Sequence, residues 1–428
     1  MIVEFSVKNF RSIKNLQTIS FVATELKSSN EYPTVDDNNI FKNENGLRIL
    51  KTVGIYGANA GGKSNLIKAF DFFVKAIIAQ PSSQSNLGLL CDPFLYQLDA
   101  NNTESFFQIV IIIDNVKFRY GFTVKKNPVA QKPDDTSHSR EIITNEWLFG
   151  GKDEKLLFER VGQKIEKNNL QNEKILIPDK LPYEHSLYLN HVAAFDSNSY
   201  CENIINYLRG RIRMNVSSDT NSLRYFSQNY VDGIFSKDKS KFIEFLSVFN
   251  MKYKDLFVQK DHDNPIIDDF PLEKYFLQKE YTVDGQILNV VLNLKNNESG
   301  GTQKLFDMAG LFLRTFNLTK PAFIVIDEID SNFHPSLLIK LISLFNDPEV
   351  NKSNSQLLFT SHDTNLMLPS LMRRDQFYFA EKMEDDSTRL YSLADLKGIC
   401  NDADFAKQYL AGYYGALPVL KNYSNNQE

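Results

Sequence analysis

The stretch Gly57-Ala-Asn-Ala-Gly-Gly-Lys63-Ser64 decides the fold, because it matches the phosphate-binding pattern G-x-x-x-x-G-K-[ST]. The apolar run Ile49–Tyr56 predicts a strand before it, and apolar residues at helical spacing over Asn65–Ala79 predict a helix after it. In this setting glycines turn backbone N–H groups toward phosphates, and the helix N-terminus adds positive potential. The residues expected around the phosphates of ATP are Gly57, Ala58, Asn59, Ala60, Gly61, Gly62, Lys63, Ser64 and Asn65. We expect Lys63 to hold the β- and γ-phosphates and Ser64 to ligate Mg²⁺.

A second apolar run, Phe323-Ile-Val-Ile-Asp327-Glu328, ends in two acidic residues. Such a strand lies beside the phosphate-binding loop in nucleotide-binding α/β folds. We expect Asp327 to bind Mg²⁺ through water and Glu328 to orient or deprotonate the attacking water. The plainer alternative is a buried strand whose acids are solvated, and the preceding loop favours the nucleotide site over it.

The segment Glu298-Ser299-Gly300-Gly301 precedes a predicted helix, where free N–H groups form another anion site. One chain does not need two sites for one γ-phosphate. The segment resembles the signature of ABC-type ATPases, which implies that Ser299, Gly300 and Gly301 cap the nucleotide of a partner subunit. The plainer alternative is a helix cap formed by Ser or Thr.

The strand predicted at Leu357–Thr360 is followed by Ser361-His362. The same resemblance implies that His362 contacts the γ-phosphate and that Asp330 lies along a dimer interface. It also makes His334 an interface or helix-start residue. A structural or solvated histidine is the alternative for His362. A hydrolase triad is not favoured, because the sequence contains no G-x-S-x-G nucleophile elbow.

The composition is that of a soluble globular chain, with 42% hydrophobic residues, 24% charged residues and a net charge of −5. This charge gives no general basic surface for nucleic acid. The cysteines, Cys91, Cys201 and Cys400, form no Cys-x-x-Cys pair, which argues against a zinc site and fits a reducing cytosol. No signal peptide is visible, and the apolar run Phe106–Ile113 is too short to cross a membrane. We expect a cytoplasmic protein with no membrane partner.

The order of these patterns predicts an α/β fold, the head of an ABC-type ATPase with a P-loop sheet, an antiparallel β subdomain and a helical insert. Apolar residues recur at helical spacing from about 198 to 276. We expect one ATPase made of three parts, an N-terminal lobe at 1–197, a helical insert at 198–280 and a C-terminal lobe at 281–428. The ATPase core does not need the insert, so we expect the insert to meet partners.

Local patterns predict the antiparallel strands. Residues 1–25 are typical of a β-hairpin, and residues 26–46 of a polar loop. Strands at Ser105–Ile113 and Val116–Val124 flank Asp114-Asn115, which predicts a two-residue hairpin turn.

Together the motifs resemble the RecF/SMC-like branch of ABC ATPases. The residues that carry the resemblance are Asn9-Phe10-Arg11-Ser12, the loop with Asn65, Ser299-Gly-Gly-Thr302, Asp327-Glu-Ile-Asp330, His334-Pro335 and Thr360-Ser-His362. The terminal Tyr409-Leu-Ala-Gly-Tyr-Tyr-Gly-Ala-Leu-Pro418 narrows it to prokaryotic abortive-infection ATPases of the AbiL/RloA type, described as AAA-type ATPase cores related to OLD proteins. The resemblance to this family covers both ends of the chain. It says little about the structure of residues 125–280.

The resemblance implies an ATP-dependent head-to-head homodimer in anti-phage defence, with Arg11 near the nucleotide. Gln97 and Asn190 compete for the glutamine position of the Q-loop. The chain lacks the long coiled coil with a Cys-x-x-Cys tip that tethers DNA in SMC and Rad proteins. The residues after His362 are too few for the nuclease of OLD proteins, so we expect a separately encoded effector or toxin, such as a nuclease.

Three functions follow from these patterns. The first is a sensor and scaffold, in which ATP closes the dimer and the closed form binds or restrains the effector. The second is a RecF/SMC-like DNA-binding or repair enzyme, for which Arg209-Gly-Arg211-Ile-Arg213 could contact phosphates. A solvated face or an interface paired with acids is the favoured explanation of this cluster, because the flanking sequence is not broadly basic. The third, a metabolic NTPase or a transporter subunit, is disfavoured by the Asn-Phe-Arg-Ser start.

Overall fold

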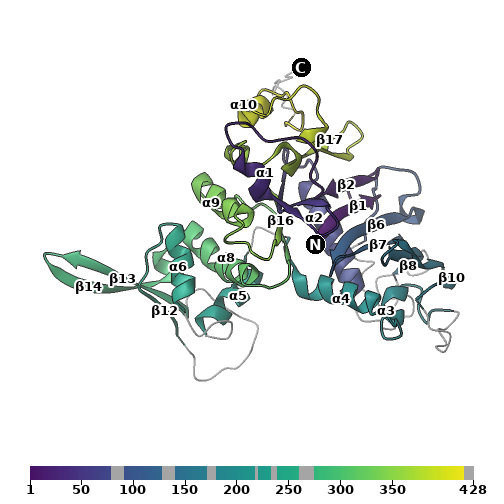
Figure 1. The fold of residues 1–428 in the computed structure, drawn as a ribbon, viewed down its shortest axis with the longest axis horizontal. Coiled ribbons are helices and arrows are strands. Elements are labelled where there is room, and N and C mark those ends of the chain that lie inside the picture. Colours follow the sequence, from purple (N-terminus) through teal and green to yellow (C-terminus); the bar gives the residue numbers. More distant parts are fainter. Residues whose placement is uncertain are drawn as a thin grey trace, which may run out of the picture.

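The computed structural model describes residues 1–78, 91–127, 140–170, 180–216, 220–232, 239–259 and 274–418. Two large β-sheets organise these residues, and a hairpin projects from one side of the body (Figure 1). Within these ranges no helix combines the length and the apolar character needed to span a bilayer.

The first sheet is antiparallel and has the strand order β10-β9-β8-β7-β6-β1-β2. Its strands are β1 Ile2–Lys8, β2 Gln17–Ser20, β6 Ser105–Ile113, β7 Val116–Lys126, β8 Glu141–Gly150, β9 Lys155–Val161 and β10 Lys164–Asn168. The hairpin predicted in residues 1–25 is confirmed, since β1 and β2 pair antiparallel. The turn predicted at Asp114-Asn115 is also confirmed, with positive φ angles of 47° and 63° that match a type I′ turn.

The second sheet carries the phosphate-binding loop and has the order β11-β15-β16-β5-β17-β18. Its strands are β5 Thr52–Tyr56, β11 Ile212–Asn215, β15 Phe323–Ile326, β16 Gln356–Thr360, β17 Phe377–Lys382 and β18 Thr388–Ser392. The first five pair in parallel, and only β18 runs antiparallel to its neighbour. Strands β15, β16, β5 and β17 are buried, which explains why their sequences are mostly apolar.

Helix α2 (Lys63–Ile78) joins the two sheets, because it buries aromatic side chains on two faces. Phe70 meets Phe5 of the antiparallel sheet at a centroid distance of 4.8 Å and Phe323 of the parallel sheet at 5.4 Å. Phe73 stacks on Phe122 at 5.5 Å. Truncating one such buried Phe to Ala typically lowers the free energy of unfolding by about 3 to 5 kcal/mol. This packing therefore holds α2 in a fixed position between the two sheets.

A second helical layer covers the other face of the parallel sheet. Its helices are α5 Asn221–Val231, α6 Ser240–Val248, α8 Gly300–Phe316, α9 Pro335–Asn346 and α10 Phe405–Leu410. Helices α5 and α8 approach closely at Gly310, where an added Cβ would meet the backbone of Ser227. Ser227 Oγ accepts from Gly310 N–H at 2.9 Å and donates to the carbonyl of Phe306 at 2.5 Å. The absence of a side chain at Gly310 therefore lets the two helix backbones touch, and the Ser227 hydroxyl links them by hydrogen bonds.

The segment expected to be helical at 198–276 is helical only in part. Helices α4 (Tyr200–Arg211), α5 and α6 agree with the expectation, but Ile212–Asn215 forms strand β11, paired in parallel with β15. Asp255–Val258 is also a strand, β12. Residues 217–219, 233–238 and 260–273 lie outside the described residues. Gly210 near the end of α4 is the only local sign of the change, and the strand itself depends on its pairing with β15, which local sequence does not show.

The projecting hairpin consists of β13 (Tyr275–Val283) and β14 (Gln286–Asn293), seen at the left of Figure 1. Asp284 and Gly285 form its turn, with φ angles of 50° and 79°. The remaining short elements are α1 Thr34–Asn39, α3 Tyr188–Val192, α7 Leu294–Asn297, β3 Ile40–Lys42 and β4 Arg48–Leu50, with 3₁₀ turns at Ala100–Asn102, Thr364–Leu366, Arg374–Gln376 and Leu393–Asp395.

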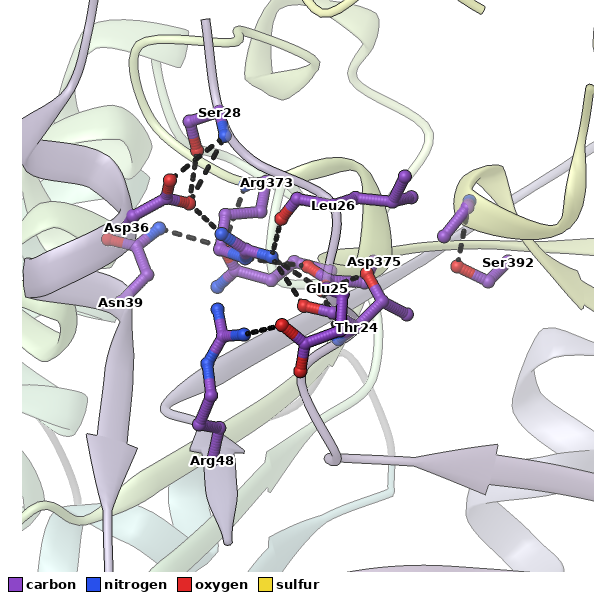
Figure 2. A network of polar contacts seen from close by, with 12 residues as sticks. Thr24, Glu25, Leu26, Ser28, Asp36, Asn39, Arg48, Arg373, Asp375 and Ser392 are labelled. Carbon is purple, nitrogen blue, oxygen red and sulfur yellow. Dashed lines mark hydrogen bonds and ion pairs between the residues drawn. The ribbon is translucent and has the colours of Figure 1, made fainter. Parts of the chain in front are cut away.

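Arg373 ties the N-terminal segment to the C-terminal half of the chain (Figure 2). Its buried guanidinium donates to the carbonyl of Leu26 at 2.5 Å, bonds Asp375 at 3.0 Å and pairs with Asp36. Asp375 also accepts from the N–H and the hydroxyl of Thr24, each at 2.8 Å. The loop expected at 26–46 therefore holds a helix and a strand, and its Asp36 and the carbonyl of Leu26 are partners of Arg373.

The variant Arg373→Met is expected to lower the free energy of unfolding by about 3 to 5 kcal/mol, because it leaves Asp375 buried without its cation. Urea denaturation measures the change. The matched control is Lys75→Met, which breaks the more exposed Lys75–Asp71 pair on α2 and is expected to cost about 0.5 kcal/mol or less. Equal effects of the two variants would contradict a structural role for Arg373.

Candidate functional site

A pocket of about 470 Å³ opens where the phosphate-binding loop meets the carboxyl ends of β15 and β16. Its lining residues are Asn59, Ala60, Gly61, Gly62, Lys63, Ser64, Asn65, Glu328 and His362. The structure thus brings together, in one cavity, three motifs that are separated by up to some three hundred residues in the sequence. Ligand sites in open α/β sheets lie at this end of the strands.

The loop closes tightly because two glycines meet neighbouring strands. Gly57 and Gly62 have φ angles of 144° and 100°, a region that strongly favours glycine. An added Cβ would meet the carbonyl of Ala380 on β17 at the first position and the hydroxyl of Thr388 on β18 at the second. The loop's backbone amides are therefore positioned by close packing against β17 and β18.

The C-terminal motif also holds this loop. Ala58 N–H donates to the carbonyl of Ala416 at 2.9 Å, and Ala416 N–H donates to Glu381 Oε1 at 3.0 Å. Tyr391 donates to the carbonyl of Tyr414 at 2.5 Å. The segment that carried the family resemblance at Tyr409–Pro418 is thus a support of the phosphate-binding loop.

Lys63 is folded onto its own loop. Its Nζ donates to the carbonyls of Gly57 at 2.8 Å and Ala58 at 3.1 Å, and it lies 3.3 Å from His362 Nδ1. These three contacts use all three donors of the ammonium group. Burial lowers the pKa of Lys63 to about 8, although Asp327, Asp330 and Glu328 act in the opposite direction. A phosphate here would replace neutral carbonyl partners with a charged one.

The two acids at the end of β15 are held by one hydroxyl. Thr360 Oγ1 donates to Asp327 Oδ1 at 2.5 Å and accepts from Glu328 N–H at 2.7 Å. Asp327 is buried, whereas the Glu328 side chain lines the pocket. Glu328 has a φ of 49°, which is uncommon for a residue with a side chain, and this conformation directs the chain away from β15 just after the two acids.

His362 faces the same pocket. Burial and the nearby Lys63 ammonium lower the pKa of His362 below its usual range, so the imidazole is neutral near pH 7. In the tautomer that carries its proton on Nε2, the Nδ1 atom can accept from the Lys63 ammonium. His362 N–H also donates to Asp330 Oδ2 at 3.0 Å, which links the histidine to the loop after β15. The neutral ring can donate one hydrogen bond to an anion in the pocket.

The donors near the two acids suit magnesium. Ser64, Asp327 and Glu328 supply only oxygen ligands, which Mg²⁺ prefers. Within the described ranges, no group of three or more His, Cys, Asp or Glu side chains could hold a metal ion by itself. A magnesium ion here would therefore take its other ligands from water and phosphate, as is usual for Mg²⁺.

Ser299, Gly300 and Gly301 do not line this pocket. Ser299 is the N-cap of α8, and its Oγ accepts from Thr302 N–H at 3.2 Å, so the helix-cap interpretation is correct as local structure. Ser299 and Gly300 are nevertheless exposed, and an added Cβ at Gly300 would meet nothing within 4 Å. The N-terminus of α8, a kind of helix end that generally attracts anions, is therefore open to solvent outside its own chain's pocket.

The remaining predicted residues lie around the pocket or away from it. Arg11 pairs with Asp92 at 3.4 Å and does not line the pocket. Neither candidate for the Q-loop position lines it, since Gln97 bonds Asn9 at 2.7 Å and Asn190 lies in α3 beside the antiparallel sheet. His334 is the N-cap of α9, as expected for a helix-start residue.

Sequence reasoning missed Thr360 and Lys304. Lys304 projects from α8, and its buried Nζ donates to the carbonyls of Glu328 at 3.3 Å, Ile329 at 3.2 Å and Ser331 at 2.8 Å. Burial lowers the pKa of Lys304 to about 8. Its sequence setting, between Gln303 and the apolar pair Leu305-Phe306, contains no clear signal of this role.

Removing the Thr360 hydroxyl in Thr360→Val is expected to lower the free energy of unfolding by about 1 to 3 kcal/mol, because Glu328 N–H loses its acceptor. Urea denaturation checks this value. Thr360→Ser keeps the hydroxyl and serves as the matched control, with most of the stability retained. A valine variant as stable as the serine variant would show that the hydroxyl does not hold the two acids.

Comparison with known proteins gives one family. Residues 53–368 match the family described as "AAA domain, putative AbiEii toxin, Type IV TA system". This match covers more than half of the chain. It includes most of β5, the phosphate-binding loop, and the strands that precede Glu328 and His362. No curated protein matches the chain. The chain therefore belongs to this AAA domain family, and its α/β body is an AAA-type ATPase core.

Proposed function

We propose that the chain is an ATP-hydrolysing enzyme that works as a head-to-head homodimer of the ABC type. The proposal rests on one observation. The phosphate-binding loop, Glu328 and His362 share a pocket, whereas the Ser299 segment, which is also shaped for an anion, opens outside it. A second copy of the chain would bring its own α8 N-terminus to the open side of the nucleotide and complete the site.

The geometry supports a role for each residue in the pocket. Lys63 would exchange two backbone carbonyls for the β- and γ-phosphates. Ser64 and Asp327 would hold Mg²⁺, which neutralises charge that develops on the phosphates. Glu328 would orient or deprotonate the attacking water, and neutral His362 would donate to the γ-phosphate. Arg11 has a weaker case, because its guanidinium already pairs with Asp92.

The wider function is defence against phage, with the ATPase as sensor and scaffold for a separate effector. The matching family is linked by its description to an AbiEii toxin and to a toxin–antitoxin system, which fits an abortive-infection ATPase of the AbiL/RloA type. The closed dimer would bind or restrain the effector, since the γ-phosphate makes contacts in only one of the two states. The effector, such as a nuclease, would be a separately encoded protein.

We further propose three parts in this ATPase, a lobe at 1–197, an insert at 198–280 and a lobe at 281–428. The projecting hairpin formed by β13 and β14 extends away from both large sheets (Figure 1), but it crosses the boundary at 280, so the projecting part of the chain continues beyond this insert to Asn293. Helix α4 and strand β11 belong by packing to the core, so the insert's independent portion begins after Asn215. This portion is the proposed surface for the effector.

A second candidate function is a RecF/SMC-like enzyme that acts on DNA. Arg209, Arg211 and Arg213 favour it, because all three lie at the turn from α4 into β11 and two of them line a common pocket. Capture of nucleic acid by the Glu328→Gln protein in Mg-ATP, with no protein partner, would favour this candidate over the scaffold.

If each nucleotide site is formed by residues of two subunits, two inactive variants should complement each other when mixed. Lys63→Ala and Ser299→Arg are each expected to lack ATPase activity, and an equal mixture is expected to regain about a quarter of wild-type turnover. Half of the dimers in that mixture are mixed, and each of these has one intact site of two. Phosphate release measures the activity. Asn296→Arg, which adds the same charge on an exposed position of α7, is the control and should stay active.

If the mixture stays as inactive as its parts while Asn296→Arg is active, the site is not shared between subunits. If Ser299→Arg alone retains full turnover, the segment plays no part in hydrolysis.

The variant Glu328→Gln is expected to bind ATP but to hydrolyse it at least about a hundredfold more slowly, because an amide cannot act as a base. Slow turnover should accumulate the ATP-bound dimer, which size-exclusion chromatography with light scattering detects. Normal turnover in this variant would remove Glu328 from the proposed role, and a monomer in saturating Mg-ATP would contradict the dimer.

A further inference from the structure

A second pocket, of about 300 Å³, lies at the other end of the parallel sheet. Its lining residues are Gly210, Arg211, Arg213, Phe226, Leu311, Arg314, Thr315, Leu318 and Ala322. The pocket is formed where β11 and β15 begin, whereas Glu328 and the nucleotide pocket follow the end of β15. The two pockets are therefore separated by the length of the parallel sheet.

Three arginines converge on this small cavity. Arg213 and Arg314 both lie over the ring of Phe226, at 5.7 Å and 5.8 Å from its centroid. Neither Arg211 nor Arg213 makes an ion pair with a carboxylate in the part of the chain that the structure describes. Burial, followed by the charges of Arg314 and Arg211, lowers the pKa of Arg213. Like charges held this close favour the binding of an anion.

Some of the donors of Arg213 stabilise the fold and are not available to a ligand. Arg213 uses three N–H groups to bond the carbonyls of Arg209, Gly210 and Ile212 at the end of α4, at 3.1 Å, 3.0 Å and 2.6 Å. A guanidinium has five donors, so two remain without a partner among the described residues. Arg211 donates one bond, to the carbonyl of Lys320 at 3.4 Å. The helix-end contacts thus hold the guanidinium of Arg213 in place and leave donors for a ligand.

We propose that this pocket binds a phosphate ester of about mononucleotide size, at a site distinct from the phosphate-binding loop. Guanidinium groups bind phosphate oxygens in pairs through parallel N–H bonds. Leu311, Leu318 and Ala322 give the cavity an apolar wall, which suits the base or another flat part of such an ester. The volume is at the lower end for ligand sites, about 300 to 1,000 Å³, and so fits a small ester.

The site's position gives the ligand a route to the nucleotide pocket. Arg314 is near the end of α8, whose first turn carries Gly300 and Gly301, and a helix of this length spans about 25 Å. Ala322 directly precedes β15, which leads to Asp327 and Glu328. A ligand here touches the two elements that carry the acids and the exposed anion site. Binding itself does not depend on the proposed hydrolysis.

The test uses the full chain in the Lys63→Ala background, in which the phosphate-binding loop is disabled. Isothermal titration with AMP measures small-ester binding, and fluorescence anisotropy with a labelled single-stranded oligonucleotide measures nucleic acid. The double variant Arg211→Gln/Arg314→Gln removes two cations and spares Arg213, which caps α4. The control is Lys340→Gln, which removes an exposed cation on α9. Thermal melts confirm that each variant is folded.

AMP binding that weakens about tenfold or more in the double variant, and is unchanged in Lys340→Gln, is the expected result. Oligonucleotide binding with the same dependence, in the absence of AMP binding, would keep the phosphate chemistry and identify nucleic acid as its source. Such binding would also fall steeply with added salt. If neither probe binds, or if both bind equally well to the folded double variant, the proposal is overturned.

Discussion

The structure depends on one constraint, which is that α2 must bury side chains on opposite faces at once. Phe70 contacts rings from both sheets, and Phe73 stacks on the antiparallel one. A helix that is apolar around most of its surface cannot lie on a single sheet with its other face in water. Its only stable place is between the two sheets. Once the helix is fixed there, its N-terminus and Lys63 are fixed at the carboxyl ends of the parallel strands.

The phosphate-binding loop then acquires its shape from residues that come much later in the chain. Ala380 and Thr388 leave no space for a side chain at Gly57 and Gly62. Ala416 accepts a hydrogen bond from Ala58 N–H. The loop is therefore supported by the C-terminal strands as well as by the strand that precedes it. This explains in physical terms why the Tyr- and Gly-rich terminal motif accompanies the phosphate-binding loop in the resemblance found from sequence.

Much of this arrangement could be predicted, because its signals are local. Apolar runs predicted β5, β15 and β16, and helical spacing predicted α2. The pair Asp114-Asn115 predicted a hairpin turn. The order of the motifs also indicated which residues share the pocket.

What could not be predicted depends on contacts between distant parts of the chain. Strand β11 exists through its pairing with β15, and the segment at 26–46 is ordered by Arg373. Nothing in the sequence near Thr360 shows that its hydroxyl holds two acids from another strand. Hydrogen bonds formed across the fold leave no periodic pattern behind, so composition and spacing do not reveal them.

Helix α8 and the loop after β15 act mechanically as one unit, because Lys304 joins them. A buried lysine with its donors on three backbone carbonyls cannot leave them without losing several charge-assisted hydrogen bonds, each worth about 1.5 to 3 kcal/mol. A force on α8 is therefore passed to Glu328 and to Asp330, which bonds His362 N–H. The same helix presents Ser299 to the outside at one end and Arg314 to the second pocket at the other. One helix thus connects the exposed Ser299 segment, the acidic side of the pocket at the phosphate-binding loop and an arginine-lined cavity. This shared helix is the structural connection through which the proposed dimer could couple its nucleotide state to a partner.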